Sequence, residues 1–238
     1  MTAPPLPLLQ DVLNLIRERR TDEAKRLIDK DHSLMEQRDE SGRTVLHNAA
    51  VVGLLPLVEL AITEAKQDIN DEDSLGWTPL MIASSSGKEE IVRYLLSFHQ
   101  TNVSHMNNNG QTPLHYACSK GHSKIVSMLI ENGADLNGRD KYGATPLHRA
   151  SSQGRDDIVK ILVSSAGIKI DSKDGEGKTP LYHACEEGCT QCIIYLVMAG
   201  ADGTIEDTEG KSPCDVVKNE ETGRVLIETR KKYKEMIN

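Results

Sequence analysis

Short groups of apolar residues recur along the chain at the spacing of one face of an amphipathic helix. Near the N-terminus, the apolar residues between 8 and 19 follow this spacing at Leu9, Val12, Leu13 and Ile16. Further along, similar groups start at Ile91, Ile125 and Ile158, each followed directly by a valine and then by further apolar residues one turn later. The pattern predicts a series of short helices, each with one buried face, and therefore an all-α fold.

A second pattern precedes these helices and repeats at a fixed distance. Its copies are GRTVLHNA from Gly42, GWTPLMIA from Gly76, GQTPLHYA from Gly110, GATPLHRA from Gly143, GKTPLYHA from Gly177 and GKSPCDVV from Gly210. The hydroxyl residue of each copy lies 33 or 34 residues from the next one. A period near 33 with the motif T-P-L-H-x-A is typical of the ankyrin repeat, which consists of a β-turn and two helices. The chain therefore resembles an ankyrin-repeat solenoid.

The residues around each motif agree with this interpretation. An Asp or Asn begins each turn and a Gly ends it, as in Asp39 to Gly42 and Asp140 to Gly143. Glycine adopts the positive φ that such a turn requires. The threonine that follows is a good N-cap, and a proline fits the first helical turn, where its missing N–H costs nothing.

We expect one ankyrin-repeat domain over residues 1–238, made of seven helix-pair units with β-turn tips. The first unit lacks the motif and the last has a degraded copy, as expected for capping repeats that face water on one side. Residues 1–7 are rich in proline, and we expect them to be loose. The predicted boundaries are 8–38 for the N-terminal cap, 39–72, 73–106, 107–139, 140–173 and 174–206 for the full repeats, and 207–238 for the C-terminal cap.

Composition and charge exclude several classes of partner. The formal net charge is −8 and the sequence pI is about 5.5, whereas a nucleic-acid-binding domain is usually basic. No apolar run approaches the roughly 20 residues that a membrane span needs, and the N-terminus lacks the basic region of a signal peptide. Five cysteines, an odd number, favour free thiols in a reducing compartment. We therefore expect neither nucleic acid nor membrane as a partner, and a location in the cytoplasm and nucleus.

The candidate chemical groups have structural explanations. His47, His115 and His148 share one position of the repeat, so we expect each ring to bond backbone and hydroxyl groups of neighbouring turns rather than to act in catalysis. Gly177-Lys178-Thr179 ends like a phosphate-binding loop, but the first glycine of that motif would fall at Ser172. We expect no cofactor and no enzymatic activity, because no pair of residues outside the repeat pattern forms an acid–base or nucleophile arrangement.

The late cysteines leave an alternative open. Cys185, Cys189 and Cys192 lie near His183 and could suggest a metal site, but they lack the paired C-x-x-C elements of a structural zinc site. Cys185 and Cys192 occupy apolar positions of the repeat, where cysteine serves as a small buried side chain. We expect no metal ligand. A redox role for Cys189, in the turn between two helices, remains an alternative.

The remaining candidate site is a surface. The turn tips and first helices of an ankyrin array line one concave face, and the residues that flank the fixed motif are free to vary there. Trp, Tyr and Arg are the residue types that most often anchor protein interfaces, and groups of both charge signs select a partner with complementary charges. The alternative is that these are ordinary solvated residues. The predicted partner-binding residues are Asp39, Glu40, Arg43, Asp73, Trp77, Ser85, Tyr116, Lys120, Tyr142, Arg149 and Glu187.

Beyond the general repeat, the chain resembles the gankyrin family over nearly its whole length. The likeness rests on seven units with a motif-free first repeat and on the segments GRTVLHNA, DEDSLGWTPL, NNNGQTPLHYACSKG and GATPLHRA. The resemblance implies a chaperone of proteasome regulatory-particle assembly, which holds the C-terminal domain of one ATPase-ring subunit in its concave face and delays docking on the core particle. It implies basic contacts at Arg43 and Lys120 and acidic contacts at Asp39, Glu40 and Asp73. Two acidic positions of the family are Ser41 and Ser74 here.

Two further functions are weighed against this one. The first is an ankyrin adaptor or inhibitor of another protein, such as a kinase or a transcription regulator. The second is a metal- or redox-responsive protein that uses the late cysteines. In each case we expect a monomer when no partner is bound.

Overall fold

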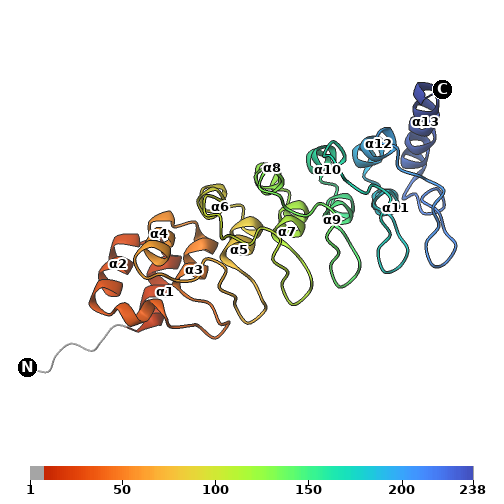
Figure 1. Cartoon of the computed structure of the whole chain (residues 1–238). Coiled ribbons are helices and arrows are strands. Elements are labelled where there is room, and N and C mark those ends of the chain that lie inside the picture. Colours follow the sequence, from red (N-terminus) through yellow and green to blue (C-terminus); the bar gives the residue numbers. More distant parts are fainter. Residues whose placement is uncertain (1–7, 238) are drawn as a thin grey trace, which may run out of the picture. The chain divides into compact units, whose positions relative to one another are not determined.

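The computed structural model describes residues 8–237, so the expectation for residues 1–7 lies outside the described part of the chain. The chain divides into two compact units, residues 1–108 and 109–238, called unit 1 and unit 2 below. The described residues form thirteen α-helices and one short 3₁₀ helix, and no strand. Within each unit, helices follow one another in pairs and a long turn separates successive pairs (Figure 1). The predicted all-α repeat fold is confirmed.

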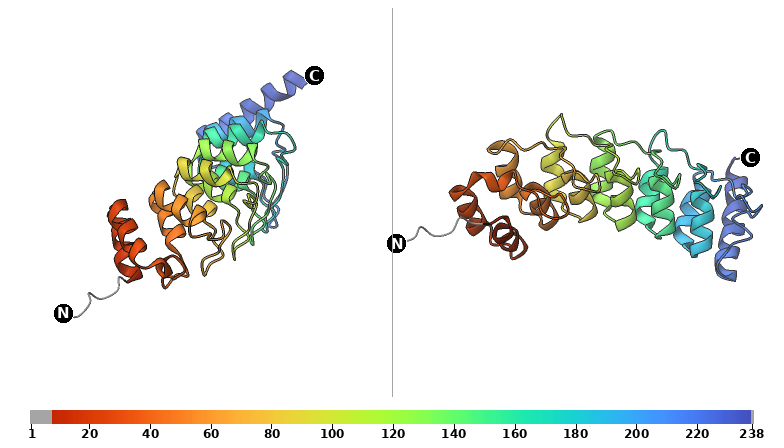
Figure 2. Two further views of the ribbon diagram at one scale, coloured as in Figure 1. Left: turned by 60° about the vertical axis from the view of Figure 1, so that its left-hand side comes forward. Right: turned by 90° about the horizontal axis from the view of Figure 1, so that it is seen from below.

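Unit 1 begins with the helix pair that lacks the motif. Its turns project to one side of its helices (Figure 2). The second helix of the second repeat ends at Thr63, and Lys66, three residues later, has a positive φ of 55°, which interrupts helical geometry. The elements are α1 (Leu9–Arg17), α2 (Thr21–Lys30), the 3₁₀ helix η1 (His32–Met35), α3 (Val45–Val52), α4 (Leu55–Thr63), α5 (Pro79–Ser85) and α6 (Glu89–Leu96).

Unit 2 contains three complete helix pairs and one long terminal helix. In the last predicted repeat, residues 213–216 form a turn, so α13 is the only helix that follows α12 up to residue 237, where the described part of the chain ends. Asp215 stands where other repeats have histidine, and its Oδ2 accepts hydrogen bonds from the backbone N–H (2.8 Å) and the hydroxyl (2.6 Å) of Ser212. The elements are α7 (Pro113–Lys120), α8 (Ser123–Glu131), α9 (Pro146–Ser152), α10 (Asp156–Val163), α11 (Pro180–Glu187), α12 (Thr190–Met198) and α13 (Glu220–Ile237).

The first helix of each pair that carries T-P-L starts at the threonine and proline that the sequence singled out. Thr112 precedes α7 in extended conformation, and its Oγ1 accepts a hydrogen bond from the N–H of His115 at 3.4 Å. Pro113 occupies the first helical position, and Gly121 ends the helix with a positive φ of 88°. A left-handed glycine satisfies the last carbonyl groups of a helix without a side-chain clash.

Each of the three motif histidines connects its own repeat to the next one within a unit. The N–H of Thr145 donates to Nδ1 of His148 at 3.1 Å, and Nε2 of the same ring lies 3.1 Å from the carbonyl oxygen of Lys178. Because Nδ1 accepts a hydrogen bond from a backbone N–H, the neutral ring carries its proton on Nε2, and this Nε2–H donates a hydrogen bond to the carbonyl oxygen. His47 and His115 make equivalent contacts to the carbonyl oxygens of Asp71 and Ala144. The structural role predicted for these histidines is confirmed.

The core of each unit is made of aliphatic side chains between thin helical layers. The motif leucines Leu46 and Leu80 in unit 1 and Leu114, Leu147 and Leu181 in unit 2 are at most 1% exposed. Truncating such a leucine to alanine typically costs about 2–5 kcal/mol of stability. This packing holds the turns at fixed positions relative to the helices of their own unit.

None of the helices within residues 8–237 has the length and apolar character required to cross a lipid bilayer.

Candidate functional site

The aspartate at the start of each turn organises the turn around itself. Oδ1 of Asp39 accepts hydrogen bonds from the N–H of Ser41 (2.9 Å) and of Arg43 (3.0 Å). Backbone bonds from Gly42 to Asp39 (2.8 Å) and from Asp39 to Arg43 (2.9 Å) complete the loop. Asp73, Asp140, Asp174 and Asp207 bond their own turns in the same way. The turn tips are therefore rigid, although they project into solvent.

Adjacent tips of one unit are also bonded to each other. In unit 1 the N–H of Ser74 donates to the carbonyl oxygen of Ser41 at 3.0 Å. In unit 2 the N–H of Gly175 donates to the carbonyl oxygen of Tyr142 at 2.7 Å. These bonds set the spacing between neighbouring tips, so the side chains on successive tips of a unit form an ordered row.

The second carboxylate oxygen of the turn aspartate holds a side chain from the first helix that follows. Asn48 donates to Oδ2 of Asp39 (3.1 Å), Arg149 donates through Nε to Oδ2 of Asp140 (3.1 Å), and Nε2 of His183 lies 2.8 Å from Oδ2 of Asp174. All three occupy the position after the Leu-His pair, which the sequence marked as free to vary. The residue type at this position therefore determines both the side-chain hydrogen bond to the turn aspartate and the group that is exposed at the surface.

The structure brings two predicted site residues of unit 1 together. Nε of Arg43 donates to Oδ2 of Asp73 at 2.9 Å, and the Asp73 side chain is only 1% exposed. Oδ1 of Asp73 accepts from the backbone N–H of Leu75 and of Trp77. Both oxygens of Asp73 are thus occupied within the protein, and the Arg43 side chain is 30% exposed.

The other predicted residues of unit 1 differ in exposure. Glu40 is exposed at its tip, whereas Asp39, Trp77 and Ser85 are half-buried. Burial alone would raise the pKa of Asp39, but hydrogen bonds from the backbone of Arg43, the Asn48 amide and the backbone of Ser41 hold that pKa below its usual value. The Asp39 carboxylate therefore stabilises the turn and also places a negative charge at the surface.

In unit 2 the predicted residues Tyr142 and Arg149 lie together. The Tyr142 side chain is 69% exposed, and the guanidinium carbon of Arg149 lies 5.9 Å from the centre of its ring. Both line a groove of about 430 Å³ between α9 and α11, together with Lys141, His148, Asp174 and His183. An exposed aromatic ring beside a fixed guanidinium is the type of feature that anchors a protein partner.

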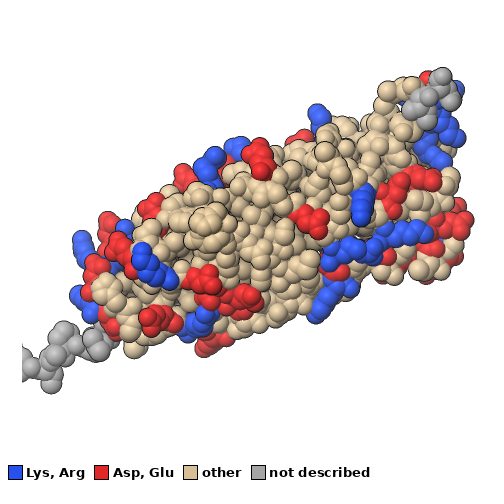
Figure 3. All heavy atoms as spheres, in the orientation of Figure 1, with Lys and Arg blue, Asp and Glu red and all other residues tan. Residues whose placement is uncertain are grey.

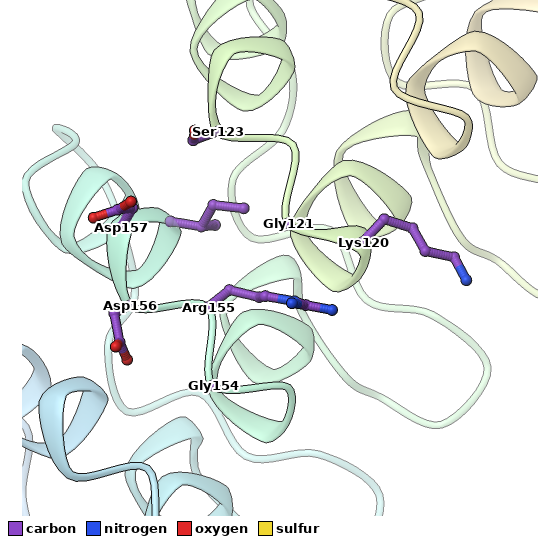
Figure 4. A pocket seen from close by; sticks show the side chains of 8 residues that line it. Lys120, Gly121, Ser123, Gly154, Arg155, Asp156 and Asp157 are labelled. Atoms are coloured by element: carbon purple, nitrogen blue, oxygen red, sulfur yellow. The ribbon is translucent and has the colours of Figure 1, made fainter.

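The remaining predicted residues of unit 2 lie elsewhere on it. Tyr116 is half-buried and donates its hydroxyl to Oε1 of Gln111 at 2.6 Å. Lys120, exposed at the end of α7, borders a hollow of about 330 Å³ with Arg155 and Asp156. Figure 4 shows the Lys120 side chain extending away from Asp156 and Asp157. Glu187, exposed at the end of α11, lies 3.8 Å from the Lys218 ammonium group.

The sequence analysis missed two exposed apolar side chains in unit 1. Leu75 is 61% exposed and Met106 is 50% exposed. Leu75 directly precedes the turn glycine, and Tyr142 occupies the same position in its own turn. Aligning the repeats therefore places Leu75 at a turn tip, as it does Tyr142. Leu75 and Trp77 therefore both contribute to the tip surface of unit 1.

Charges on the face seen in Figure 3 gather differently over the two units. Acidic side chains cluster over the turns of unit 1, and a band of Lys and Arg crosses the turns of unit 2. Exposed residues at these turns include Glu40 and Glu72 in unit 1 and Arg139, Lys141 and Lys173 in unit 2. The acidic turns of unit 1 thus favour a basic partner surface, and these Lys and Arg residues of unit 2 favour an acidic one, although Glu176 and Glu209 are also exposed at turns of unit 2.

No group of His, Cys, Asp and Glu side chains within residues 8–237 is placed to hold a metal ion. All five cysteines are free thiols.

Comparison with known proteins gives one family. The family model described as ankyrin repeats (3 copies) matches residues 14–107, 97–174 and 139–207.

Three curated relatives match shorter segments. The chain is 37% identical over 77 residues to the 26S proteasome non-ATPase regulatory subunit 10 of Dictyostelium discoideum, which is 32% of this chain and 33% of that protein. It is 54% identical over 56 residues, 23% of this chain, to dauer abnormal formation protein 25 of Caenorhabditis elegans, and 43% identical over 68 residues, 28% of this chain, to ankyrin repeat and SAM domain-containing protein 6 of Rattus norvegicus. The matched segments are 14% and 8% of those two proteins, so the chain spans a third or less of each relative.

Among solved structures, the chain is similar to the ankyrin repeat domain of Bcl-3, a member of the IkappaB protein family. The TM-score is 0.76 with 23% sequence identity, and the match covers 91% of this chain and 97% of that one. At this identity the likeness shows the fold.

Proposed function

Because the chain belongs to the ankyrin-repeat family and is a protein-interaction scaffold, we propose that it is a non-enzymatic assembly chaperone of the 26S proteasome regulatory particle. Its turn tips and first helices hold the C-terminal domain of one ATPase-ring subunit. The held domain is blocked from the core particle until assembly displaces the chaperone. The scaffold acts as a monomer, in the cytoplasm and nucleus.

The observation that carries this proposal is the similarity to the 26S proteasome non-ATPase regulatory subunit 10, at 37% identity over 77 residues. It agrees with the resemblance to the gankyrin family, which rests on motifs in both units. The likeness to Bcl-3 concerns the fold, so it favours no second function.

The surface of each unit supports binding of a preformed protein domain. The tips are held by hydrogen bonds that backbone N–H groups donate to the turn aspartates, so little conformational entropy is lost when a partner binds. Tyr142 and Arg149 provide an aromatic anchor in unit 2, and Leu75 with Trp77 provides an apolar one in unit 1. A chaperone that acts by occupying the surface of its partner requires no catalytic group.

The charges on the turn tips further restrict the kind of partner surface that can bind. The acidic tips of unit 1 suit a basic patch of a partner, and the Lys and Arg residues at the turns of unit 2 suit an acidic patch. Because Asp73 is saturated by internal bonds, the exposed acids of unit 1, such as Glu40, are the ones that meet the partner.

Affinity capture of the tagged chain from cell extract, with identification of the bound proteins by mass spectrometry, tests the proposal. We expect one proteasomal ATPase with other base subunits and little intact holoenzyme. Tyr142→Ala should reduce the recovery, and Lys231→Glu on the exposed face of α13 should not. Recovery of a non-proteasomal protein in place of an ATPase would replace the chaperone with an adaptor on the same scaffold.

A further inference from the structure

Two cysteines lie on the first turn of α12. Cys189 is its N-cap residue and Cys192 is the third residue of the helix. The carbonyl oxygen of Cys189 already accepts the first helical hydrogen bond, from the N–H of Ile193 at 3.0 Å. Residues three apart on a helix have β-carbons about 5–6 Å from each other, and small adjustments of the N-cap residue bring such a pair into the range of a disulfide.

Both sulfur atoms face the same segment of the preceding repeat. The Cys192 thiol donates a hydrogen bond to Oδ1 of Asp156 at 3.0 Å. The Cys189 sulfur lies 3.0 Å from the place that a β-carbon on Gly154 would occupy. Gly154 lies in the loop before α10 and Asp156 is the first residue of that helix, so both sulfurs face the N-terminal end of α10.

The other cysteines have different surroundings. Cys118 and Cys185 are fully buried in first helices, at a position where other repeats have a small residue. Cys214 is exposed, and its sulfur accepts a hydrogen bond from Arg230 at 3.3 Å. Within residues 8–237, Cys189 and Cys192 are the only cysteines that share one helical turn.

We propose that Cys189 and Cys192 form a reversible disulfide by exchange with a small disulfide such as glutathione disulfide, and that its formation breaks the hydrogen bond between Cys192 and Asp156. The site is independent of the proposed partner surface.

The exchange is balanced in two steps. The Cys189 thiolate, half-exposed, attacks one sulfur of glutathione disulfide, which forms a mixed disulfide and releases one glutathione thiolate. The Cys192 thiolate then attacks the Cys189 sulfur, forms the protein disulfide and releases the second glutathione. The two cysteine protons end on the two glutathione thiols, the protein thiols are oxidised, and glutathione disulfide is reduced.

The consequence falls on the contact between α10 and α12. Figure 4 shows the Asp156 carboxylate pointing away from Lys120, toward the light-blue ribbon of the next repeat. In the reduced state the Cys192 proton lies between that carboxylate and α12. In the oxidised state no proton remains there, so Oδ1 of Asp156 needs water or another donor, and the first turn of α10 loosens.

Asp156 controls the rate of the second step. Burial, the hydrogen bond and the negative charge of Asp156 all raise the pKa of Cys192. Burial and the charges of Asp156 and Glu187 raise the pKa of Cys189. Because the thiolate is the nucleophile, the disulfide forms slowly at neutral pH while Asp156 is ionised.

The reduced full-length chain should be incubated in glutathione buffers of graded ratio, alkylated and analysed by peptide mass spectrometry. We expect a Cys189–Cys192 disulfide that reverses in reduced glutathione. Cys214→Ser should leave its yield unchanged, and Cys192→Ser should stop at the mixed disulfide on Cys189. Formation of the Cys189–Cys192 disulfide only after denaturation, or a stable mixed disulfide on wild-type Cys189, would overturn the proposal.

A matched pair of variants tests the role of Asp156. Asp156→Asn keeps a hydrogen-bond acceptor but removes the charge, so ring closure should accelerate by about threefold for each unit by which the Cys192 pKa falls, because the larger thiolate fraction is partly offset by the lower nucleophilicity of that thiolate. The rise of the rate with pH should also begin at lower pH. Asp157→Asn, next to it but exposed, should leave both the rate and its pH profile unchanged. Equal behaviour of the two variants would show that Asp156 does not control the thiol.

Discussion

The imidazole of His148 in α9 and the backbone carbonyl oxygen of Lys178, thirty residues further along, are joined by a 3.1 Å hydrogen bond. The same ring accepts the N–H of Thr145 at 3.1 Å on its other nitrogen. One buried side chain thus holds the start of its own helix and the turn of the next repeat. The motif histidine therefore contributes to the spacing between tips on which the proposed binding surface depends.

Replacing His148 with alanine should destabilise the chain by about 3 kcal/mol, because the buried Thr145 amide and the Lys178 carbonyl both lose a partner and a cavity remains. Urea denaturation followed by circular dichroism measures the change. His99→Ala, at an exposed position, is the control and should cost less than about 0.5 kcal/mol. A loss at His148 no larger than at His99 would contradict the linking role.

Stability should fall as the pH falls from about 6.5 to 4. Burial lowers the pKa of His148 to about 4 and also lowers the pKa values of His47 and His115. The unfolded chain takes up protons at these histidines near pH 6.5, before the folded chain does, so acid favours unfolding in this window. The His148 term alone amounts to about 3 kcal/mol. Denaturation curves at several pH values test this, and in His148→Ala the slope should be smaller.

Asp171→Asn should stabilise the chain by about 1 kcal/mol at neutral pH. Asn70 and Asn137 occupy the same repeat position, and each donates its amide to a carbonyl of the next loop, at Gln100 and Gly167. Asp171 accepts the N–H of Asp202 at 3.0 Å but cannot donate, and burial raises its pKa.

The pH dependence of the stability gain in Asp171→Asn shows whether the gain comes from removing the ionised carboxylate or from the new amide hydrogen bond. The penalty for ionised Asp171 is present above its folded-state pKa and disappears below the unfolded value near 4. The advantage of Asp171→Asn, measured by urea denaturation, should therefore shrink in acid. An advantage that stays constant with pH would assign the gain to the amide hydrogen bond alone.

Arg43→Glu should cost roughly 2–3 kcal/mol, because it leaves the buried Asp73 carboxylate without its cation and adds a like charge beside it. Lys120→Glu should change stability by less than about 0.5 kcal/mol, since Lys120 is exposed. Thermal unfolding of the two variants compares them directly. If Arg43→Glu melts like the wild type, the Arg43–Asp73 pair does not stabilise unit 1, and the variant becomes usable as a binding probe.

The repeat pattern predicted the helices because each local signal agrees with the same fold. Thr112 and Pro113 start a helix, Gly121 ends it, and the apolar spacing gives its buried face. The role of the motif histidines was also predictable, because one position shared by three repeats points to a shared structural contact.

The partners of the variable side chains were not predictable. Arg43 bonds Asp73 in the following repeat, whereas Arg149 bonds Asp140 in its own repeat, and the repeat motif does not distinguish the two choices. In the fifth full repeat Tyr182 replaces the histidine and donates its hydroxyl to Oδ2 of Asp207 at 2.7 Å. Side-chain length and the geometry between repeats decide these contacts.

Exposure at the tips depends on the same geometry. Leu75 and Tyr142 precede the turn glycine and project into solvent at 61% and 69% exposure. The periodicity that locates a buried helix face carries no information about a non-helical tip. The predicted site residues remain a prediction that binding experiments must test.

The most direct test of the central claim is isothermal titration calorimetry of the purified chain with the isolated C-terminal domain of each proteasomal ATPase subunit. We predict that one domain binds with one-to-one stoichiometry, and that Lys120→Glu combined with Tyr142→Ala weakens binding at least about tenfold, a loss of 1.4 kcal/mol or more, while Lys231→Glu does not. Circular dichroism confirms that each variant is folded. Absence of binding to every ATPase domain by the folded wild-type chain would contradict the account.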